Sequence, residues 1–378
     1  MHLLRNPLYP ILVGAALCLP LHPVPVLADS PADILADWKH RENAMRSAKY
    51  EITGKVVLPK GAYSNNPHLP AHAKNKLIPD KDYVYEKTML WVIDFANNRL
   101  RKDYQDQTFN FTTLKFHPLA VVQVFDGRMT KRHFPRQSNP SSSSGYADMG
   151  LVKNGNTVDI VVNDYPVFLA RGFIGVSKTL SAAKKPTTLS PTPAAFTITE
   201  RAPQMCRNVQ CRVVRIRHKD DPAGCFEELF VDRTLTSAVL RMDVYTHGVL
   251  SDRLDIVYDD KGMVPQKWTS TLFEGDSRVS ASEQLTVKRA WVNPELQAGD
   301  FDIPLTPGMR VIVGDAVTYQ HADYKVTADG SLVPIGAEAP LVRQWLPHLL
   351  VAGIATLVAL VARRLVKRFR PKDGRMCA

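Results

Sequence analysis

The feature that most constrains the fold is a series of short alternating segments between residues 195 and 292, joined by turn sequences. In one of them, Leu240, Met242 and Val244 alternate with Arg241 and Asp243. Successive side chains of a strand point to opposite faces, so this pattern predicts strands with one buried and one solvated face. The expected strands are 195–200, 211–218, 225–232, 238–245, 249–258, 266–273 and 279–292. Antiparallel strands joined in this way form a twisted meander that curls around its apolar face.

Residues 31–47 give the clearest helix prediction. Ser30 can cap it, and Ile34 and Trp38 can share its apolar face. The expected elements that follow are strands at 50–58, 83–95, 99–109, 121–125 and 157–162 and a short helix within 164–173. The Pro-rich stretch at 181–194 predicts a loop or a break between subdomains.

The N-terminus has the pattern of a secretory signal over residues 1–28. Arg5 precedes a mostly apolar stretch at 8–21, and Ala28 is a small residue at the expected cleavage point. Two alternatives stay open, namely lipid attachment at Cys18 and an uncleaved N-terminal anchor. The sequence therefore predicts an exported domain over residues 29–338.

Residues 345–362 form an apolar stretch without acidic, Lys or Arg residues. As a helix it would span roughly 27 Å, close to the hydrocarbon thickness of a bilayer. A cationic cluster follows at once, which is typical of the cytoplasmic end of a span and could contact anionic lipid. Its members are Arg363, Arg364, Lys367, Arg368 and Arg370. We predict a single-pass transmembrane helix, with a buried core helix as the alternative.

Charge follows the same division of the chain. The formal net charge is +11, and the tail at 363–378 contributes seven Lys or Arg residues and one Asp. Much of the positive charge therefore lies in the predicted cytoplasmic tail and indicates the orientation of the chain in the membrane. We expect no nucleic-acid partner. The predicted location is the inner membrane, with the main domain in the periplasm and the C-terminus in the cytoplasm. The predicted class is α+β: a curled antiparallel half-barrel covered by the N-terminal and short inserted helices, plus one C-terminal transmembrane helix.

Several strand segments resemble the LolA-like family of lipoprotein carriers and lipoprotein-sensing regulators. They are EELFVD at 227–232, VLRMDVY at 239–245, LDIVYDD at 254–260 and the stretches at 301–304 and 307–311. The resemblance implies an apolar half-barrel cavity that holds lipid or lipoprotein acyl chains, with no cofactor and no catalysis. An envelope-stress sensor that signals to a protein partner, and an envelope hydrolase, are the alternative functions.

Large apolar side chains are the candidate lining of such a cavity. They are Trp38, Trp91, Phe125, Phe230, Leu240, Met242, Leu254, Ile256 and Trp268. The alternative for all of them is ordinary core packing, because a cavity differs from a core only in what fills it. No catalytic motif with complete spacing was found, so no catalytic residue is predicted.

Three cysteines lie in the predicted exported domain. Cys206 and Cys211 are close in sequence, and an oxidising compartment favours a disulfide between them. Pairing of Cys211 with Cys225, free thiols, and a zinc site with His218 are the alternatives. The spacing matches no standard zinc pattern, so no metal is predicted.

Overall fold

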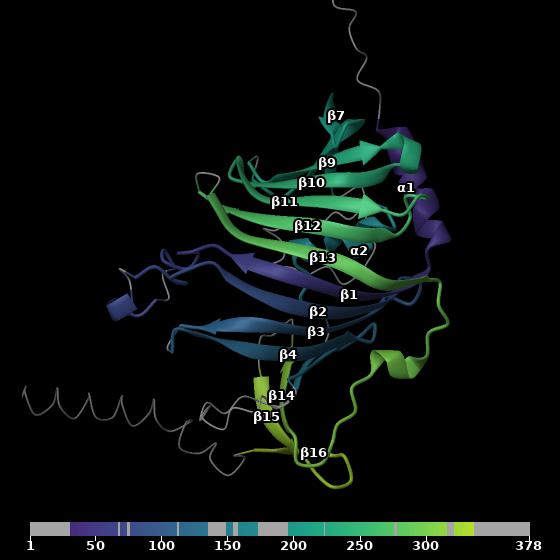
Figure 1. Cartoon of the computed structure of the whole chain (residues 1–378). Helices are drawn as coiled ribbons and strands as arrows, with labels where there is room; N and C mark the ends of the chain where they lie inside the picture. Colours follow the sequence, from purple (N-terminus) through teal and green to yellow (C-terminus); the bar gives the residue numbers. More distant parts are fainter. Residues whose placement is uncertain are drawn as a thin grey trace, which may run out of the picture.

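The computed structural model describes residues 31–66, 69–73, 76–111, 113–134, 149–153, 158–172, 196–222, 224–275, 278–315 and 321–335. Its strands form one 16-stranded sheet in the order β16-β15-β14-β6-β5-β4-β3-β2-β1-β13-β12-β11-β10-β9-β8-β7. Neighbouring strands are antiparallel except β14 and β6, which run parallel. Figure 1 shows the curvature of this sheet.

The strands of the first part are β1 Ser47–Leu58, β2 Tyr83–Asp94, β3 Arg99–Asn110, β4 Lys115–Phe125, β5 Thr130–His133 and β6 Met149–Lys153. The meander comprises β7 Phe196–Cys206, β8 Val209–His218, β9 Phe226–Asp232, β10 Ala238–Thr246, β11 Val249–Tyr258, β12 Pro265–Glu274 and β13 Arg278–Val292. The last strands are β14 Arg310–Asp315, β15 His321–Val326 and β16 Leu332–Pro334. Every strand of the expected meander is present; most ends shift by one or two residues, and β7 extends six residues beyond its expected end at residue 200.

The two parts of the sheet join where β1 pairs with β13. Gly54 lies opposite Leu285 in this pair. A Cβ at position 54 would lie 2.8 Å from the backbone oxygen of Gln284, so a larger residue would force the two strands apart. The glycine therefore permits the close approach of strands from distant parts of the chain.

The helices are few and short. They are α1 Ala32–Ala44 and α2 Tyr165–Leu169, with 3₁₀ turns η1 Ala71–Ala73, η2 Val162–Asp164, η4 Arg233–Leu235 and η5 Ala298–Phe301. Pro31 precedes α1 as its N-cap without a side-chain cap bond, so α1 begins one residue later than predicted. The expected strand at 157–162 is wrong, because residues 158–161 are irregular and η2 begins at Val162.

The predicted fold class is wrong in its helical cover, and its transmembrane helix is not borne out by the described residues. The described chain is mainly one large curled sheet with two short helices, and no helix within it has the length and apolar character needed to cross a membrane. The predicted signal at 1–28, the break at 181–194, the span at 345–362 and the tail at 363–378 lie outside the described residues.

Most of the main core lies on one face of the sheet, which we call the inner face. Met242 is opposite Leu254, and Ile256 is opposite Trp268. Directly opposed residues share a face, so these side chains form one apolar surface. Trp91 belongs to the same buried cluster, together with residues of α1 and α2. In Figure 1, α2 lies behind the sheet and α1 runs along one end of the meander.

A smaller core lies on the opposite, outer face of β2–β4. Val92 follows Trp91 along β2 and therefore points to the other side of the sheet. It packs in a cluster with Val124, Phe301 and Ile303. Leu151 of β6, Val311 of β14 and Val326 of β15 are its other buried members, so the chain after β13 covers the outer face of β2–β4.

Candidate functional site

Residues 158–172, here called the inner-face segment, lie against the apolar surface of the sheet. Their buried apolar side chains are Val158, Val162, Tyr165, Val167, Phe168, Leu169 and Ala170. The ring of Phe168 meets that of Trp91 edge to face, with centroids 5.4 Å apart. Trp268 Nε1 donates a hydrogen bond to the backbone oxygen of Asn163 at 2.9 Å. The segment therefore occupies the surface on which the sequence predicted a ligand.

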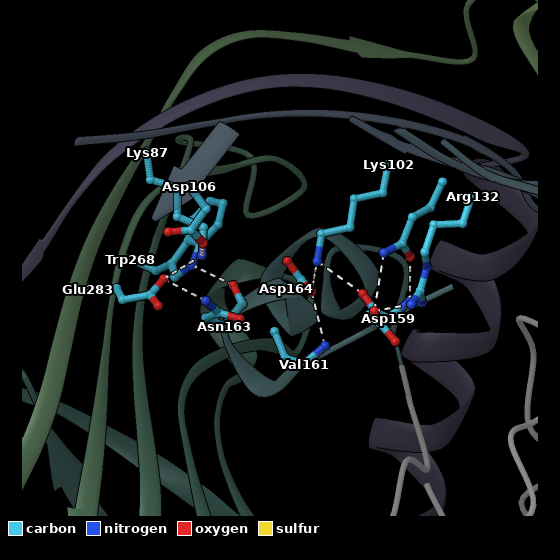
Figure 2. Close-up of polar contacts among 11 residues, drawn as sticks. Lys87, Lys102, Asp106, Arg132, Asp159, Val161, Asn163, Asp164, Trp268 and Glu283 are labelled. Atoms are coloured by element: carbon cyan, nitrogen blue, oxygen red, sulfur yellow. Dashed lines mark hydrogen bonds and ion pairs between the residues drawn. The ribbon is translucent and has the colours of Figure 1, made fainter. Parts of the chain in front are cut away.

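A buried ion pair fastens the segment to β3. Lys102 Nζ lies 2.6 Å from Asp164 Oδ2 and donates to the backbone oxygen of Asp159 at 3.0 Å. Lys102 is 5% exposed and Asp164 is fully buried. The backbone N–H of Val161 donates to the same Asp164 oxygen at 3.0 Å, which shapes the η2 turn. Figure 2 shows this pair between sheet and segment.

Asp159 makes a second polar attachment, to β4 and β5. Its backbone N–H donates to Gln123 Oε1 at 2.7 Å, and its Oδ2 accepts from Gln123 Nε2 at 3.1 Å. Arg132 Nη2 lies 2.7 Å from the same carboxylate oxygen. Gln123 is fully buried, so the reciprocal bonds satisfy an amide that burial would otherwise penalise.

Lys87 forms a third group of polar contacts. Its Nζ lies 3.2 Å from Asp106 and 3.1 Å from Glu283, and Asn163 Nδ2 donates to Glu283 at 2.5 Å. Burial lowers the pKa of Lys87, but Glu283, Asp106 and Asp164 together raise it by more, so its net shift is upward. The ammonium group is therefore held in its charged form.

Five buried polar atoms have no hydrogen-bond partner within the part of the chain that is described. They are Tyr50 Oη, Trp91 Nε1, Asn163 Oδ1, Asp164 Oδ1 and Tyr258 Oη. All belong to the inner face or to the segment that covers it. A buried polar atom left unpaired costs about 1–3 kcal/mol. Burial also raises the pKa of Tyr258 to about 12.

Arg41 of α1 holds the end of the segment. Its Nε and Nη2 donate to the backbone oxygen of Ala170 at 3.0 and 2.7 Å, and Nη2 also donates to that of Gly262 at 2.7 Å. Nη1 donates to the backbone oxygen of Thr236 at 3.2 Å. Burial lowers the pKa of Arg41, whose bonds join α1, the segment and two turns of the meander.

All nine predicted cavity residues belong to the main buried cluster. The register places Met242, Leu254, Ile256 and Trp268 on the inner face. Trp91 and Phe125 lie on the same face, because Phe125 is opposite Leu100, which is opposite Ile93. Trp38 reaches the core from α1 and donates to the backbone oxygen of Ser237 at 2.8 Å.

One of the nine, Phe230, does not share that surface, and another, Leu240, lies at an irregularity of its strand. Phe230 is opposite Arg241, whose guanidinium lies 5.5 Å from its ring centroid, and this pair is on the outer face. Leu240 lies at a register shift between Val239 and Arg241. A cavity role for the predicted residues remains a prediction.

The polar contacts between the inner-face segment and the sheet were not predicted from the sequence. A signal was available in β3, where Lys102 stands between Leu100 and Tyr104 in the buried phase of the alternation. A lysine in such a position needs a buried partner. The identity of that partner, Asp164, depends on long-range packing and could not be read locally.

Cys206 and Cys211 are buried free thiols in the structure and share a hydrogen bond. Burial raises the pKa of Cys211 to about 12, with Cys206 as a further cause. Their disulfide remains a prediction that the contact makes sterically reasonable. No group of three or more His, Cys, Asp or Glu residues suited to a metal ion occurs among the described residues.

Comparisons with known proteins complete the description. No family model matches the sequence, and no curated protein matches it. The structure is similar to an outer membrane lipoprotein-sorting protein domain from Vibrio parahaemolyticus, with 11% identity and a TM-score of 0.39, covering 71% of this chain and 94% of that chain. It is also similar to a DUF1329 family protein from Desulfovibrio piger, with 8% identity and a TM-score of 0.34, covering 71% and 97%. The first agrees with the LolA-like resemblance, but at these TM-scores the likeness carries no functional argument.

Proposed function

We propose that the inner face binds the acyl chains of lipids or lipoproteins and that the protein is a binding protein without catalysis. The observation that carries this proposal is the way in which the apolar inner face of the sheet is covered. A wide apolar face with Trp91, Leu254 and Trp268 packs against the inner-face segment, which contributes no strand and only the short helix α2. Burial of apolar area contributes about 25 cal/mol per Å², whether side chains or an acyl chain supply the contact.

Binding in this proposal exchanges one apolar cover for another. Tyr165, Val167 and Phe168 occupy the surface that an acyl chain would contact. The contacts described above attach the segment to the sheet through side chains, so it can leave without breaking a strand ladder. The cost of its release is then offset by the apolar contacts of the ligand.

We place this activity outside the cytoplasm because residues 1–28 have the pattern of a secretory signal. Lipid and lipoprotein acyl chains are available in the cell envelope, which suits a protein of this kind. Protease protection of the full-length chain in intact and permeabilised cells tests the location. Cleavage of the main domain only after permeabilisation of the inner membrane would contradict it.

A cavity variant tests binding directly. Leu254 is fully buried on the inner face, and Leu254→Ala should lower stability by about 2–5 kcal/mol and leave apolar space. A fluorescent fatty acid methyl ester should fill that space and raise the melting temperature of the variant. Val257→Ala, at an exposed position of the same strand, is the matched control and should show neither effect.

Titration of the unchanged full-length chain with the same ester supplies the second measurement. Saturable fluorescence is expected, together with a bound lipid mass in native mass spectrometry of protein purified from its host. Absence of ester binding to both the unchanged chain and Leu254→Ala would rule out the proposed function.

A further inference from the structure

We propose that the ligand of the inner face carries an anionic head group, and that Asp159 and Asp164 of the inner-face segment stand in for that group in this structure. This inference rests on the proposed function and names the class of amphiphile. Carboxylates and phosphates attached to an acyl chain share the required chemistry.

The sheet presents a row of hydrogen-bond donors at this place. Lys102 of β3 is directly opposite Gln123 of β4, and Gln123 is directly opposite Arg132 of β5. Directly opposed residues share a face, so the three side chains lie side by side across neighbouring strands. Figure 2 shows Lys102 and Arg132 converging on Asp164 and Asp159. Two cations and an amide in a row form a site suited to oxyanions.

The acceptors for Lys102 come from the segment. Its Nζ contacts Asp164 Oδ2 at 2.6 Å and the backbone oxygen of Asp159 at 3.0 Å. Lys87 differs, because its partners Asp106 and Glu283 belong to β3 and β13 of the sheet itself. Release of the segment therefore leaves Lys87 paired but takes away these two contacts of Lys102.

A buried cation that loses its partner is strongly unfavourable. Since Lys102 is 5% exposed, a neutral ligand that displaced the segment would have to leave this charge uncompensated. An anionic head group would restore the pair and would also meet Gln123 and Arg132. The sheet consequently favours exchange of one anion for another.

The order of groups along the segment matches an amphiphile. The two carboxylates at 159 and 164 come first, and the apolar run of α2, Tyr165–Leu169, follows. Across the sheet, Lys102 is directly opposite Trp91, and its Nζ lies 5.0 Å from that ring's centroid. The charged row thus adjoins the aromatic surface, as a head-group site must adjoin a site for the chain.

The test uses the full-length chain and two probes with the same tail, a fluorescent polyene fatty acid and its methyl ester. The acid should bind at least about tenfold more tightly than the ester, as expected for a charge-assisted hydrogen bond. Arg132→Gln and Lys102→Gln should reduce the acid-to-ester ratio severalfold. Lys267→Gln, an exposed lysine of β12, is the matched control and should leave the ratio unchanged.

Asp164→Asn separates head-group recognition from release of the segment. It weakens the attachment of the segment without changing the donor row, so both probes should bind more tightly at an unchanged ratio. Arg132, whose side chain is 30% exposed, keeps the test valid even if Lys102→Gln fails to fold.

Each remaining outcome decides the inference. Equal affinity for acid and ester in the unchanged chain overturns the anionic head group while the proposed function survives. Binding of neither probe overturns both. Excess inorganic phosphate should compete poorly with the acid; displacement by phosphate alone would indicate a site for the free anion and would overturn a head-group site.

Discussion

The covers of the two faces of the sheet are attached in different ways. The inner-face segment contributes no strand, and side chains such as Lys102 and Trp268 fasten it. The cover of the outer cluster continues into β14, which pairs with β6, and into β15 and β16. A main-chain ladder makes a cover part of the sheet, whereas side-chain contacts can be exchanged for those of a ligand. Burial alone therefore does not distinguish a permanent cover from a replaceable one.

The largest expected effect is on the outer cover. Phe301 is 2% exposed, and the guanidinium of Arg99 lies 4.5 Å from its ring centroid. Phe301→Ala should lower the free energy of unfolding by about 3–5 kcal/mol, because truncation of a buried aromatic leaves a cavity. Chemical denaturation measures this loss. Val333→Ala at an exposed position of β16 is the control. An equally small loss of stability in both variants would show that the outer cover is not an integral part of the sheet.

Alkaline pH should act on the inner face. The pKa of Tyr258 is raised from 10.0 to about 12 by burial, so the folded state retains a proton that the unfolded state releases. The resulting stability is present below pH 10 and is lost as pH rises from 10 toward 12, by up to about 3 kcal/mol. Unfolding should therefore become easier across this window, and Tyr258→Phe should reduce the loss.

Tyr324→Phe in the outer cover is the matched control for this pH series. It should follow the unchanged protein. Identical alkaline profiles for Tyr258→Phe and the unchanged protein would show that the buried hydroxyl of Tyr258 is not responsible.

Asp164→Asn should loosen the inner-face segment locally. Loss of the charge-assisted contact with Lys102 costs about 2–3 kcal/mol. Amide hydrogen exchange in residues 158–172 should accelerate, while that of the β11–β13 core stays slow. Asp103→Asn, which breaks the partly exposed pair with Arg101 on the same strand as Lys102, serves as control. Equal acceleration throughout the sheet would mean that the segment is as integral as β14.

The smallest expected effect concerns a third type of attachment, a covalent one at the edge strand β7. If Cys206 and Cys211 oxidise to the predicted disulfide, closure of so short a loop should add about 1–2 kcal/mol. Peptide mapping without reduction should yield the linked peptides, and Cys206→Ser should remove both the link and the added stability. Complete alkylation of both thiols in the unfolded, unreduced protein would exclude the disulfide.

Much of the sheet could be predicted because alternation is a local signal. The segment predicted as a strand at 249–258 coincides with β11. The expected strands left out β5 and β6, and they stopped at residue 292 and so left out β14–β16. All of these strands are short, and β14 pairs in parallel with the distant β6, so no local turn indicates where β14 joins the sheet.

The candidate site was predictable only in its apolar half. Leu254 and Trp268 follow the buried phase of their strands, and alternation is enough to place them. Residues 158–161 read as a strand because Val158, Ile160 and Val161 are apolar and β-branched, yet the chain turns into η2 and α2 instead. The meeting of Asp164 with Lys102 is a property of packing across the sheet, for which a single sequence contains no local pattern.

The pairing of β1 with β13 has a consequence for folding. Ala48 is opposite Val292, so the middle of the sheet cannot close until nearly all of the meander has been synthesised. Until then β1 is an open edge, and β13 remains one from its synthesis until it pairs with β1; an open edge can pair with another chain. Contacts between such distant residues also slow folding. We therefore expect slow, concentration-sensitive folding in which protection of these two strands against self-association decides the yield.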